Sequence, residues 1–206
     1  MPNNKTFVNL IIFVTAILLL NSNQSYSQRP KVGLVLSGGG AKGISHIGIL
    51  QAIDSAGLKV DYITGTSMGS IIGALYAVGY SGKEIERISD RLDWNTILSN
   101  KPHYPDISID EKDEYGKYSV EVGIKDFRPQ IATGLIESEE LWLTLNELFL
   151  PVYNIKDFSK FNIPYKCIAT DLSNGKAVVL SEGEIVKAVR ASMAIPSVFT
   201  AIDHKQ

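Results

Sequence analysis

The sequence predicts an α/β protein, a three-layer α/β/α sandwich around a mainly parallel sheet. Three observations carry this prediction. A short apolar strand at residues 31–36 ends in glycines, a second strand at residues 60–64 leads into a glycine-flanked serine, and a helical segment follows each strand. Such alternation favours a parallel sheet, because parallel neighbours are joined by a crossover that usually contains a helix. The crossovers are expected to be right-handed, with helices on both faces.

The first half of the chain supplies the elements in this order. The run Lys31–Leu36 is short and apolar, as in a strand that is buried on both faces. Apolar residues then recur at helical spacing from Ile44 to Ile53, and Gly57 is typical of a residue that ends a helix. Val60–Thr64 indicates the second strand. Ser70–Val78 is apolar almost all round, which predicts a buried helix.

The second half is more polar at first and then returns to apolar periodicity. Pro151 ends one of its helices, and Pro164 precedes a strand. The expected elements are a helix around 85–92, a surface excursion over 101–117, a helix over 137–149, strands over 165–170 and 177–180, and a helix over 184–193.

Composition excludes some classes of protein. The chain has 206 residues, 45% of them hydrophobic and 20% charged, which is an ordinary balance for one globular domain. Its formal net charge of -2 lacks the basic excess that nucleic-acid binding requires, so no nucleic-acid partner is expected. The single cysteine, Cys167, lies in an apolar run and is predicted to be a small core residue.

The N-terminus is typical of a secretory signal peptide. Lys5 precedes the apolar run Phe7–Leu20, which is shorter than the roughly 20 residues that a membrane span needs. Small residues at Ser25 and Ser27 occupy the positions that a signal peptidase recognises. We expect residues 1–27 to be removed and residues 28–206 to form one domain, exported to the periplasm, associated with the outer membrane or secreted. An uncleaved N-terminal anchor is the alternative.

The pentapeptide Gly65-Thr66-Ser67-Met68-Gly69 matches G-x-S-x-G. A nucleophilic serine in a sharp strand-to-helix turn has a strained backbone and an outward hydroxyl, and its neighbours two residues away must be small. The pattern alone is weak, but here a strand precedes it and a buried helix follows it. Ser67 is therefore the candidate nucleophile, and an ordinary glycine turn with a serine cap is the structural alternative.

The loop Gly38-Gly39-Gly40-Ala41-Lys42-Gly43 reads G-x-G-x-x-G and allows two main interpretations. In the first, bare amides form an oxyanion hole, and Lys42 adds positive charge. In the second, the loop binds a dinucleotide whose ribose is held by Asp61, about 20 residues further on. Asp61 precedes the apolar part of its strand, however, and the serine turn occupies the place where that acid belongs. The oxyanion interpretation is therefore preferred.

Taken together, these motifs resemble the bacterial, exported branch of the patatin-like phospholipase family. The resemblance runs from about Lys31 to the end of the chain. The matching blocks are Ser37–Gly43, His46–Leu50, Gly65–Ser70, Gly73–Ala77, Ala169–Leu172 with Gly175, and Ala188–Phe199.

The resemblance implies a hydrolase of acyl esters in phospholipids or other lipid esters, acting at a membrane surface through a Ser–Asp dyad. It implies no metal and no cofactor, and leaves the oligomeric state open. The family's aspartate lies in an Asp-Gly-Gly or Asp-Gly-Ala motif soon after the block that ends at Phe199. The chain reaches Gln206 without this motif, and Asp203 does not fit it. We therefore expect a catalytic domain truncated at its C-terminus, with little or no activity of its own.

Two alternatives stay open. The order Ser67, Asp171, His204 matches that of a Ser–Asp–His α/β-hydrolase. Against it, only one strand precedes the serine strand, and His204 lies near the chain end, where chains fray. The other alternative is a non-catalytic module that binds a lipid or a dinucleotide.

Overall fold

The computed structural model describes residues 8–9, 12–13, 15, 29–97, 123–125, 128–130, 139–195 and 199–202. The chain divides into two compact units, Met1–Lys31 and Val32–Gln206. In the first unit, those described residues that lie between 8 and 15 are helical. No helix within the described ranges has the length and apolar character to cross a membrane. The predicted cleavage site after Ser27 and the surface excursion over 101–117 lie outside the described residues.

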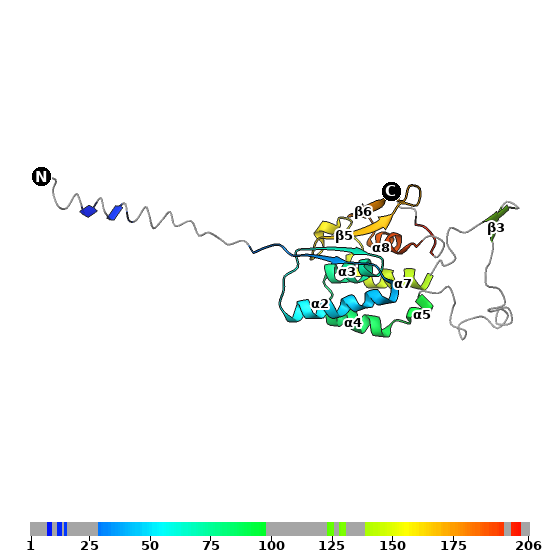
Figure 1. Cartoon of the computed structure of the whole chain (residues 1–206), viewed down its shortest axis with the longest axis horizontal. Coiled ribbons are helices and arrows are strands. Elements are labelled where there is room, and N and C mark those ends of the chain that lie inside the picture. The colour runs from blue at the N-terminus through cyan, green and yellow to red at the C-terminus, as the bar shows by residue number, and fades with distance from the viewer. Residues whose placement is uncertain are drawn as a thin grey trace. The chain divides into compact units, whose positions relative to one another are not determined.

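The second unit is built on a four-stranded sheet in the order β1-β2-β5-β6 (Figure 1). The strands β1 (Gly33–Leu36), β2 (Tyr62–Thr66) and β5 (Tyr165–Thr170) are parallel, and β6 (Ala177–Leu180) runs antiparallel to β5. The α/β class and the mainly parallel sheet are thus confirmed. The three parallel strands end at one edge, which is where open α/β sheets place their sites.

The helices connect these strands much as the periodicity predicts. The described helices are α2 (His46–Ser55), α3 (Met68–Val78), α4 (Gly82–Arg91), α5 (Trp94–Ile97), α7 (Glu139–Phe149) and α8 (Ile185–Met193). Shorter 3-10 segments are η1 (Gly40–Ser45), η3 (Leu150–Val152) and η4 (Phe158–Lys160), and a separate hairpin pairs β3 (Gly123–Lys125) with β4 (Arg128–Gln130).

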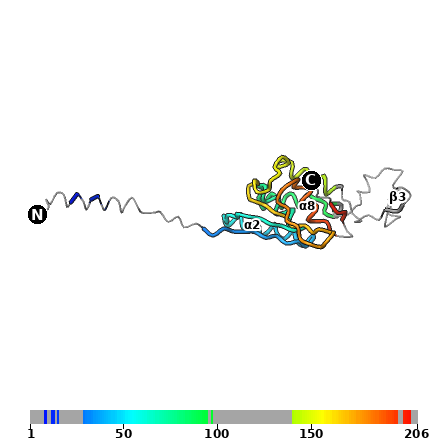
Figure 2. The backbone as a smooth tube through the Cα atoms, turned by 90° about the horizontal axis from the view of Figure 1, so that it is seen from above, coloured from blue at the N-terminus to red at the C-terminus, as the bar shows by residue number. Residues whose placement is uncertain are grey.

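In the part of the chain that the structure describes, the helices cover one face of the sheet. The helix α3 packs on β2 and α8 packs on β5, and the two helices also contact each other, so they share a face. Figures 1 and 2 show α2 and α8 apart from each other, and α3 contacts both. The opposite face is open, since the side chains of Val35, Tyr62 and Val179 are 75%, 49% and 54% exposed.

This layering has a topological cause. The strand order advances in one direction from β1 through β2 to β5. Right-handed crossovers that advance in one direction place all of their helices on the same side. A helical layer on the second face needs strands that continue in the opposite direction from β1. The described residues therefore contain two of the three predicted layers.

A stripe of small residues lets α3 lie close to the sheet. A Cβ atom on Gly73 would come within 3.1 Å of the Ile63 side chain and 3.2 Å of the Leu36 side chain. Ala77, one turn further on, is fully buried. Gly69, Gly73 and Ala77 recur every four residues in the sequence, so they lie along one side of α3. This contact fixes α3, and with it the serine turn, against the ends of β1 and β2.

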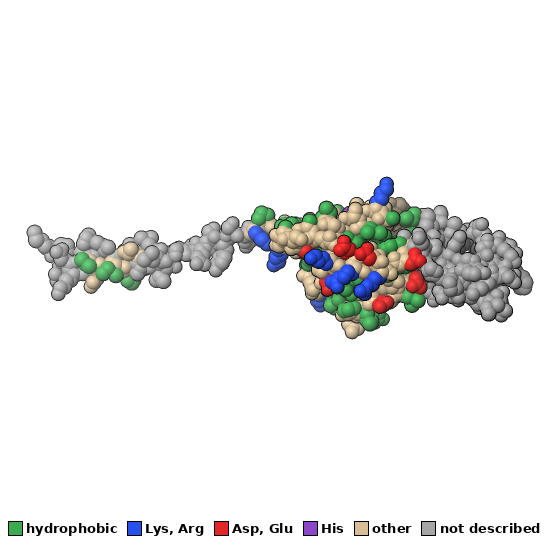
Figure 3. All heavy atoms as spheres, turned by 90° about the horizontal axis from the view of Figure 1, so that it is seen from below, with side chains coloured by type: hydrophobic (Ala, Val, Ile, Leu, Met, Phe, Trp, Pro, Cys, Tyr) green, Lys and Arg blue, Asp and Glu red, His purple; other side chains and the backbone are tan. Residues whose placement is uncertain are grey.

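The helix α4 is held at its start by a capping box. The amide of Ser81 donates to Glu84 Oε2 (2.8 Å), and the amide of Glu84 donates to Ser81 Oγ (3.4 Å). The Ser81 hydroxyl, which donates to Glu84 Oε2 (2.7 Å), and the Ser81 amide together hold the pKa of the Glu84 carboxyl below its usual range. The outer face of α4 mixes exposed basic and acidic side chains, as does the surface in Figure 3.

Candidate active site

Ser67 occupies the turn between β2 and α3 at the carboxyl edge of the sheet. Its backbone angles are φ 53° and ψ −123°, and among the described residues it is the only non-glycine residue with a positive φ. Such a conformation costs about 1–3 kcal/mol, so it persists only where the surroundings enforce it. The strained serine in the G-x-S-x-G turn is thus present as the sequence predicts.

Two glycines make this turn possible. A Cβ atom on Gly65 would overlap the backbone carbonyl oxygen of Gly69. A Cβ atom on Gly69 would overlap the carbonyl oxygen of Leu36 and lie 2.5 Å from that of Ser37. The atoms that collide belong to the backbone and cannot move aside. The small residues on either side of Ser67 are therefore a steric requirement of this turn.

Serine hydroxyls hold both backbone polar groups of Ser67. The amide of Ser67 donates to Ser192 Oγ (2.9 Å), and the Ser192 hydroxyl in turn donates to the carbonyl oxygen of Ile168 (2.5 Å). The carbonyl of Ser67 accepts from Ser70 Oγ (2.6 Å), and Tyr165 Oη donates to the Ser70 carbonyl (2.9 Å). The turn is thus attached to α8 and β5 as well as to α3.

Ser192 is the contact that sequence reasoning missed. It lies 125 residues from Ser67 in the chain. It belongs to the block Ala188–Phe199 that carries the family resemblance, but no spacing rule pairs that block with the serine turn. Only the placement of α8 against β5 and α3 brings the two serines together.

The glycine loop lies directly against Ser67. A Cβ atom on Gly38 would stand 3.2 Å from Ser67 Cβ and 3.9 Å from Ser67 Oγ. Gly40 has φ 54°, a conformation that favours glycine. The amides of Gly38, Gly39 and Gly40 donate to no acceptor among the described residues. The site therefore combines a serine hydroxyl with adjacent uncommitted amides.

The rest of the loop forms the short helix η1, which packs on α3. The amide of Lys42 donates to the carbonyl of Gly39 (3.2 Å), and the Lys42 side chain is exposed. A Cβ atom on Gly43 would come within 2.6 Å of Met68 Cβ, so a larger residue there would push the loop away from the serine turn. Gly43 thus sets the distance between the loop and α3.

His46 supports the loop. Its Nε2–H donates to the carbonyl of Ser37 (2.9 Å), which joins the first residue of α2 to the end of β1. His46 thus makes a local hydrogen bond to the backbone that leads into the glycine loop.

A general base is not found among the described residues. No described histidine or carboxylate forms a hydrogen bond with Ser67 Oγ. Asp171 is committed to its own turn, where its carboxylate accepts from the amide (2.8 Å) and hydroxyl (2.7 Å) of Ser173 and from Asn174 Nδ2 (2.8 Å). The bonds from Ser173 hold the pKa of Asp171 below its usual range. His204, the third member of the alternative triad, and Asp203 lie outside the described residues.

The position of Asp61 contradicts the dinucleotide interpretation. It precedes β2, and its Oδ2 accepts from the amide of Val32 (2.8 Å) at the amino ends of β1 and β2. A ribose bound at the glycine loop would lie at the opposite ends of these strands. The acid required by the G-x-G-x-x-G fingerprint is therefore not beside the loop.

The thiol of Cys167 is part of the core, as predicted. Its side chain is fully buried. Burial raises its pKa to about 12, so the reactive thiolate is suppressed. The described residues also contain no group of three or more side chains that could hold a metal ion.

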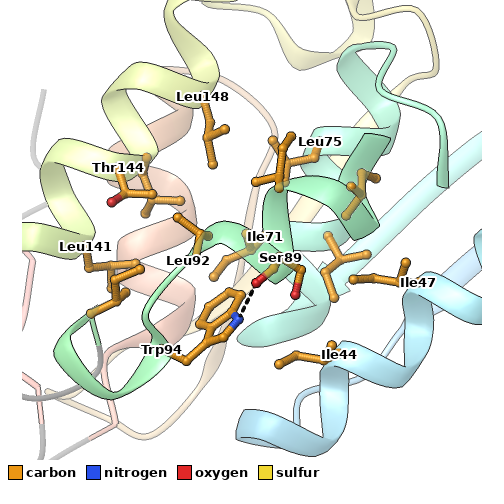
Figure 4. Close-up of a pocket in the computed structure, with 15 residues that line it drawn as sticks. Ile44, Ile47, Ile71, Leu75, Ser89, Leu92, Trp94, Leu141, Thr144 and Leu148 are labelled. Atoms are coloured by element: carbon orange, nitrogen blue, oxygen red, sulfur yellow. Dashed lines mark hydrogen bonds between the residues drawn. The ribbon is translucent and has the colours of Figure 1, made fainter. Parts of the chain in front are cut away.

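The apolar cavity in Figure 4 belongs to the core. It lies between α2, α3, α4, α5 and α7, with Ile44, Ile71 and Trp94 among its walls, and the Trp94 indole donates to the carbonyl of Ser89 (3.0 Å). Its volume is about 20 Å³. That is near the minimum for a single water, and an apolar cavity of this kind stays dry. It is too small to bind a substrate.

The family model and the similar proteins agree on one family. The family model described as patatin-like phospholipase matches residues 34–206. An uncharacterized NTE family protein of Mycobacterium tuberculosis is 30% identical over 173 residues, which make up 84% of this chain and 39% of that protein. Lysophospholipase nte1 of Aspergillus fumigatus is 32% identical over 180 residues, covering 83% of this chain and 10% of that protein. The chain therefore spans well under half the length of these relatives.

Solved structures share the fold. VipD from Legionella pneumophila superposes with a TM-score of 0.50 and 20% identity, over 82% of this chain and 43% of VipD. Full-length ExoU of the Pseudomonas aeruginosa type III secretion system, in complex with SpcU, gives a TM-score of 0.50 and 18% identity, over 82% of this chain and 39% of ExoU. At this level of identity the likeness concerns the fold alone.

Proposed function

Because the chain belongs to the patatin-like phospholipase family, whose model matches residues 34–206, we propose that it carries the nucleophile and oxyanion hole of a lipid acyl-ester hydrolase. One observation carries the proposal. The strained Ser67 lies against Gly38, in a loop where three consecutive amides are free of described acceptors. A hydroxyl nucleophile beside bare amides is the arrangement that acyl transfer needs.

The proposed reaction begins with attack of Ser67 Oγ on the ester carbonyl carbon. A new C–O bond forms, the hydroxyl proton leaves to a base, and the carbonyl oxygen becomes an oxyanion. The amides of Gly38, Gly39 and Gly40 donate to that oxygen, and loss of one such donor costs about 2.7–4 kcal/mol of barrier. Collapse of the intermediate breaks the bond between the carbonyl carbon and the alkoxy oxygen, and the base returns the proton to that oxygen, so the alcohol leaves and an acyl-serine remains. Water that gives its proton to the same base then attacks the acyl-serine, which releases the fatty acid and restores the Ser67 hydroxyl.

Two further positive features surround the nucleophile. The helix α3 begins at Met68, so its N-terminus points toward the developing negative charge. Lys42 lies in η1 beside the loop, and its exposed ammonium can interact with an oxyanion or with a lipid phosphate. Both favour an anionic intermediate over the neutral ester.

The base of the proposed reaction lies outside the described residues. We assign it to an aspartate that forms a Ser–Asp dyad with Ser67, as the resemblance implies. A serine hydroxyl without its base is a poor nucleophile, so replacing that aspartate is expected to slow the attack of Ser67 on the ester. The described part would then supply substrate positioning and transition-state stabilisation.

The proposed substrate is a phospholipid or another lipid ester at a membrane surface. The fungal relative named a lysophospholipase supports this choice, since a single-chain phospholipid is one such ester. We also propose that residues 1–27 direct export. The mature N-terminus of the secreted protein, read by mass spectrometry, tests that part, and an N-terminus upstream of Ser25 contradicts it.

The nucleophile is tested with a fluorophosphonate probe, which reacts with activated serines. The chain is expected to gain one phosphonyl group, to lose this reaction in Ser67→Ala and to keep it in Ser55→Ala. Ser55 is a matched control, because its hydroxyl donates to the carbonyl of Gln51 on an exposed helix end. Fatty-acid release from lysophosphatidylcholine is expected to follow the same order.

Labelling that survives Ser67→Ala, or no labelling at all, contradicts the assignment. The dinucleotide alternative makes a different prediction. It requires saturable binding of a nicotinamide dinucleotide that is lost in Asp61→Asn, and calorimetry detects such binding directly.

A further inference from the structure

A second, larger cavity lies between α8 and the β5–β6 strand pair. Its volume is about 400 Å³, within the range of about 300–1,000 Å³ that is typical of small-molecule sites. Its walls include Ala169 and Leu180 from the strands and Ala191 and Ala194 from α8 and its end. Ala169 and Leu180 are buried, at 8% and 5% exposure. Three of these four side chains are alanines, and Ala201 and Ile202 also line the cavity.

The chemistry of the walls is divided. Leu172 and Val178 add apolar surface, and both are partly exposed, at 47% and 37%. Thr170, Asp171 and Ser173 also line the cavity; Thr170 and Ser173 are exposed to solvent, and the Asp171 carboxylate accepts hydrogen bonds from Ser173 and Asn174. Polar side chains therefore line the part of the cavity that faces solvent, whereas buried apolar side chains line its interior. An apolar pocket with a polar rim selects a ligand with a hydrocarbon body and a polar end.

The cavity lies next to the contact that holds the nucleophile. Ser192 Oγ bonds both the amide of Ser67 and the carbonyl of Ile168. Ala191 and Ala169, which line the cavity, are the immediate chain neighbours of Ser192 and Ile168. The cavity thus begins one residue away from the attachment point of the serine turn, at the same edge of the sheet.

We infer that this cavity, called here the α8–β6 pocket, binds the acyl chain of the ester that Ser67 attacks. The inference rests on the proposed function, because it assigns part of the same substrate. A hydrocarbon chain suits the interior, since each buried methylene contributes about 0.8 kcal/mol to binding. The small cavity of Figure 4, at about 20 Å³, offers no comparable room.

The strand β6 provides a matched pair of variants. Val178 pairs with Ala169 and lines the pocket, whereas Val179 pairs with Ile168 and points to the open face of the sheet. Val178→Asp places a carboxylate in the apolar wall. Val179→Asp makes the same chemical change one residue further on, where the side chain is 54% exposed. The two variants alter charge and strand propensity alike.

The experiment measures binding without hydrolysis. Octanoyl and dodecanoyl lysophosphatidylcholine, each below its critical micelle concentration, are titrated into the Ser67→Ala chain by calorimetry. The two lipids share a head group, so their difference reports the acyl chain alone. The dodecanoyl lipid is expected to bind about fourfold more tightly for each extra methylene that the pocket buries. Val178→Asp is expected to abolish this dependence on chain length, and Val179→Asp to retain it.

A second variant, which fills the pocket, tests the inference even if Val178→Asp fails to fold. Ala194→Phe occupies the pocket with an apolar side chain and is expected to weaken the dodecanoyl lipid more than the octanoyl lipid. Thermal unfolding checks that each variant is folded. Equal effects of the two aspartates, equal affinity for the two lipids, or no binding of either overturns the inference. The proposed function fails separately, as loss of Ser67-dependent probe labelling, because this titration uses a chain that has no nucleophile.

Discussion

The hydrogen bond that the amide of Ser67 donates to Ser192 Oγ gives the sharpest prediction about the serine turn. Ser192→Ala removes the acceptor at 2.9 Å from that amide and also removes the donor to Ile168. A polar group left without its partner in a partly buried site costs about 1–3 kcal/mol. The strained φ of 53° at Ser67, itself worth about 1–3 kcal/mol, then loses one of the contacts that oppose its relaxation.

If this free energy is lost from the conformation in which Ser67 reacts, the population of that conformation drops about 5- to 150-fold. The assay is the second-order rate of fluorophosphonate labelling, measured where urea unfolding shows each variant to be more than nine-tenths folded. Ser192→Ala is expected to label at least about fivefold more slowly. Ser192→Thr keeps the hydroxyl and is expected to recover most of the rate. A destabilised Ser192→Ala that labels at the wild-type rate would refute the reasoning, because the bond would then support the fold without aligning the nucleophile.

Three other predictions follow from the packing and the pKa values. Gly69→Ala places a Cβ atom against two backbone carbonyls, so it is expected to lower the free energy of unfolding in urea by about 1–3 kcal/mol. Gly48→Ala is the control: this glycine lies on a helix with open space around it, and alanine there is expected to raise the free energy of unfolding by about 0.5–1 kcal/mol. The Cys167 thiol, with its pKa near 12, is expected to resist maleimide in the native state and to react only on unfolding, so fast native labelling contradicts its burial. The pKa of Glu84 is lowered from its ordinary 4.5 by the Ser81 bonds, so its contribution is complete above pH 4.5 and is lost as the pH falls through the folded value. The stability difference between wild type and Glu84→Gln should therefore shrink as the pH falls below 4.5, and a difference that grows there contradicts the capping role.

The sequence predicted the elements whose signals are local. The strands over 165–170 and 177–180 have the predicted bounds, because apolar runs and turn residues define them without help from distant parts of the chain. The strand before the serine extends to Thr66 rather than ending at Thr64. Gly65 is disfavoured in strands, and the pairing of Gly65 with Cys167 and of Thr66 with Ile168 carries the strand past it.

The candidate site likewise has one part that the sequence predicts and another that only the structure shows. The strained serine turn and its two glycines follow from five adjacent residues, and the glycine loop from six. The partnership of Ser67 with Ser192 depends on how α8 packs against β5, and the α8–β6 pocket depends on the same contact. The face of the sheet that each helix covers also depends on a long-range property, the direction in which the strand order advances. The two glycine motifs could be predicted from adjacent residues, whereas contacts between residues far apart in the chain required the structure.

The most direct test of the account is a crystal structure of the chain after reaction with a fluorophosphonate. The proposed oxyanion hole predicts phosphorus bonded to Ser67 Oγ, with the phosphoryl oxygen about 2.7–3.1 Å from amide nitrogens of the Gly38–Gly40 segment. A phosphonyl group on another residue, or an oxygen turned toward solvent while those amides face away, would contradict it.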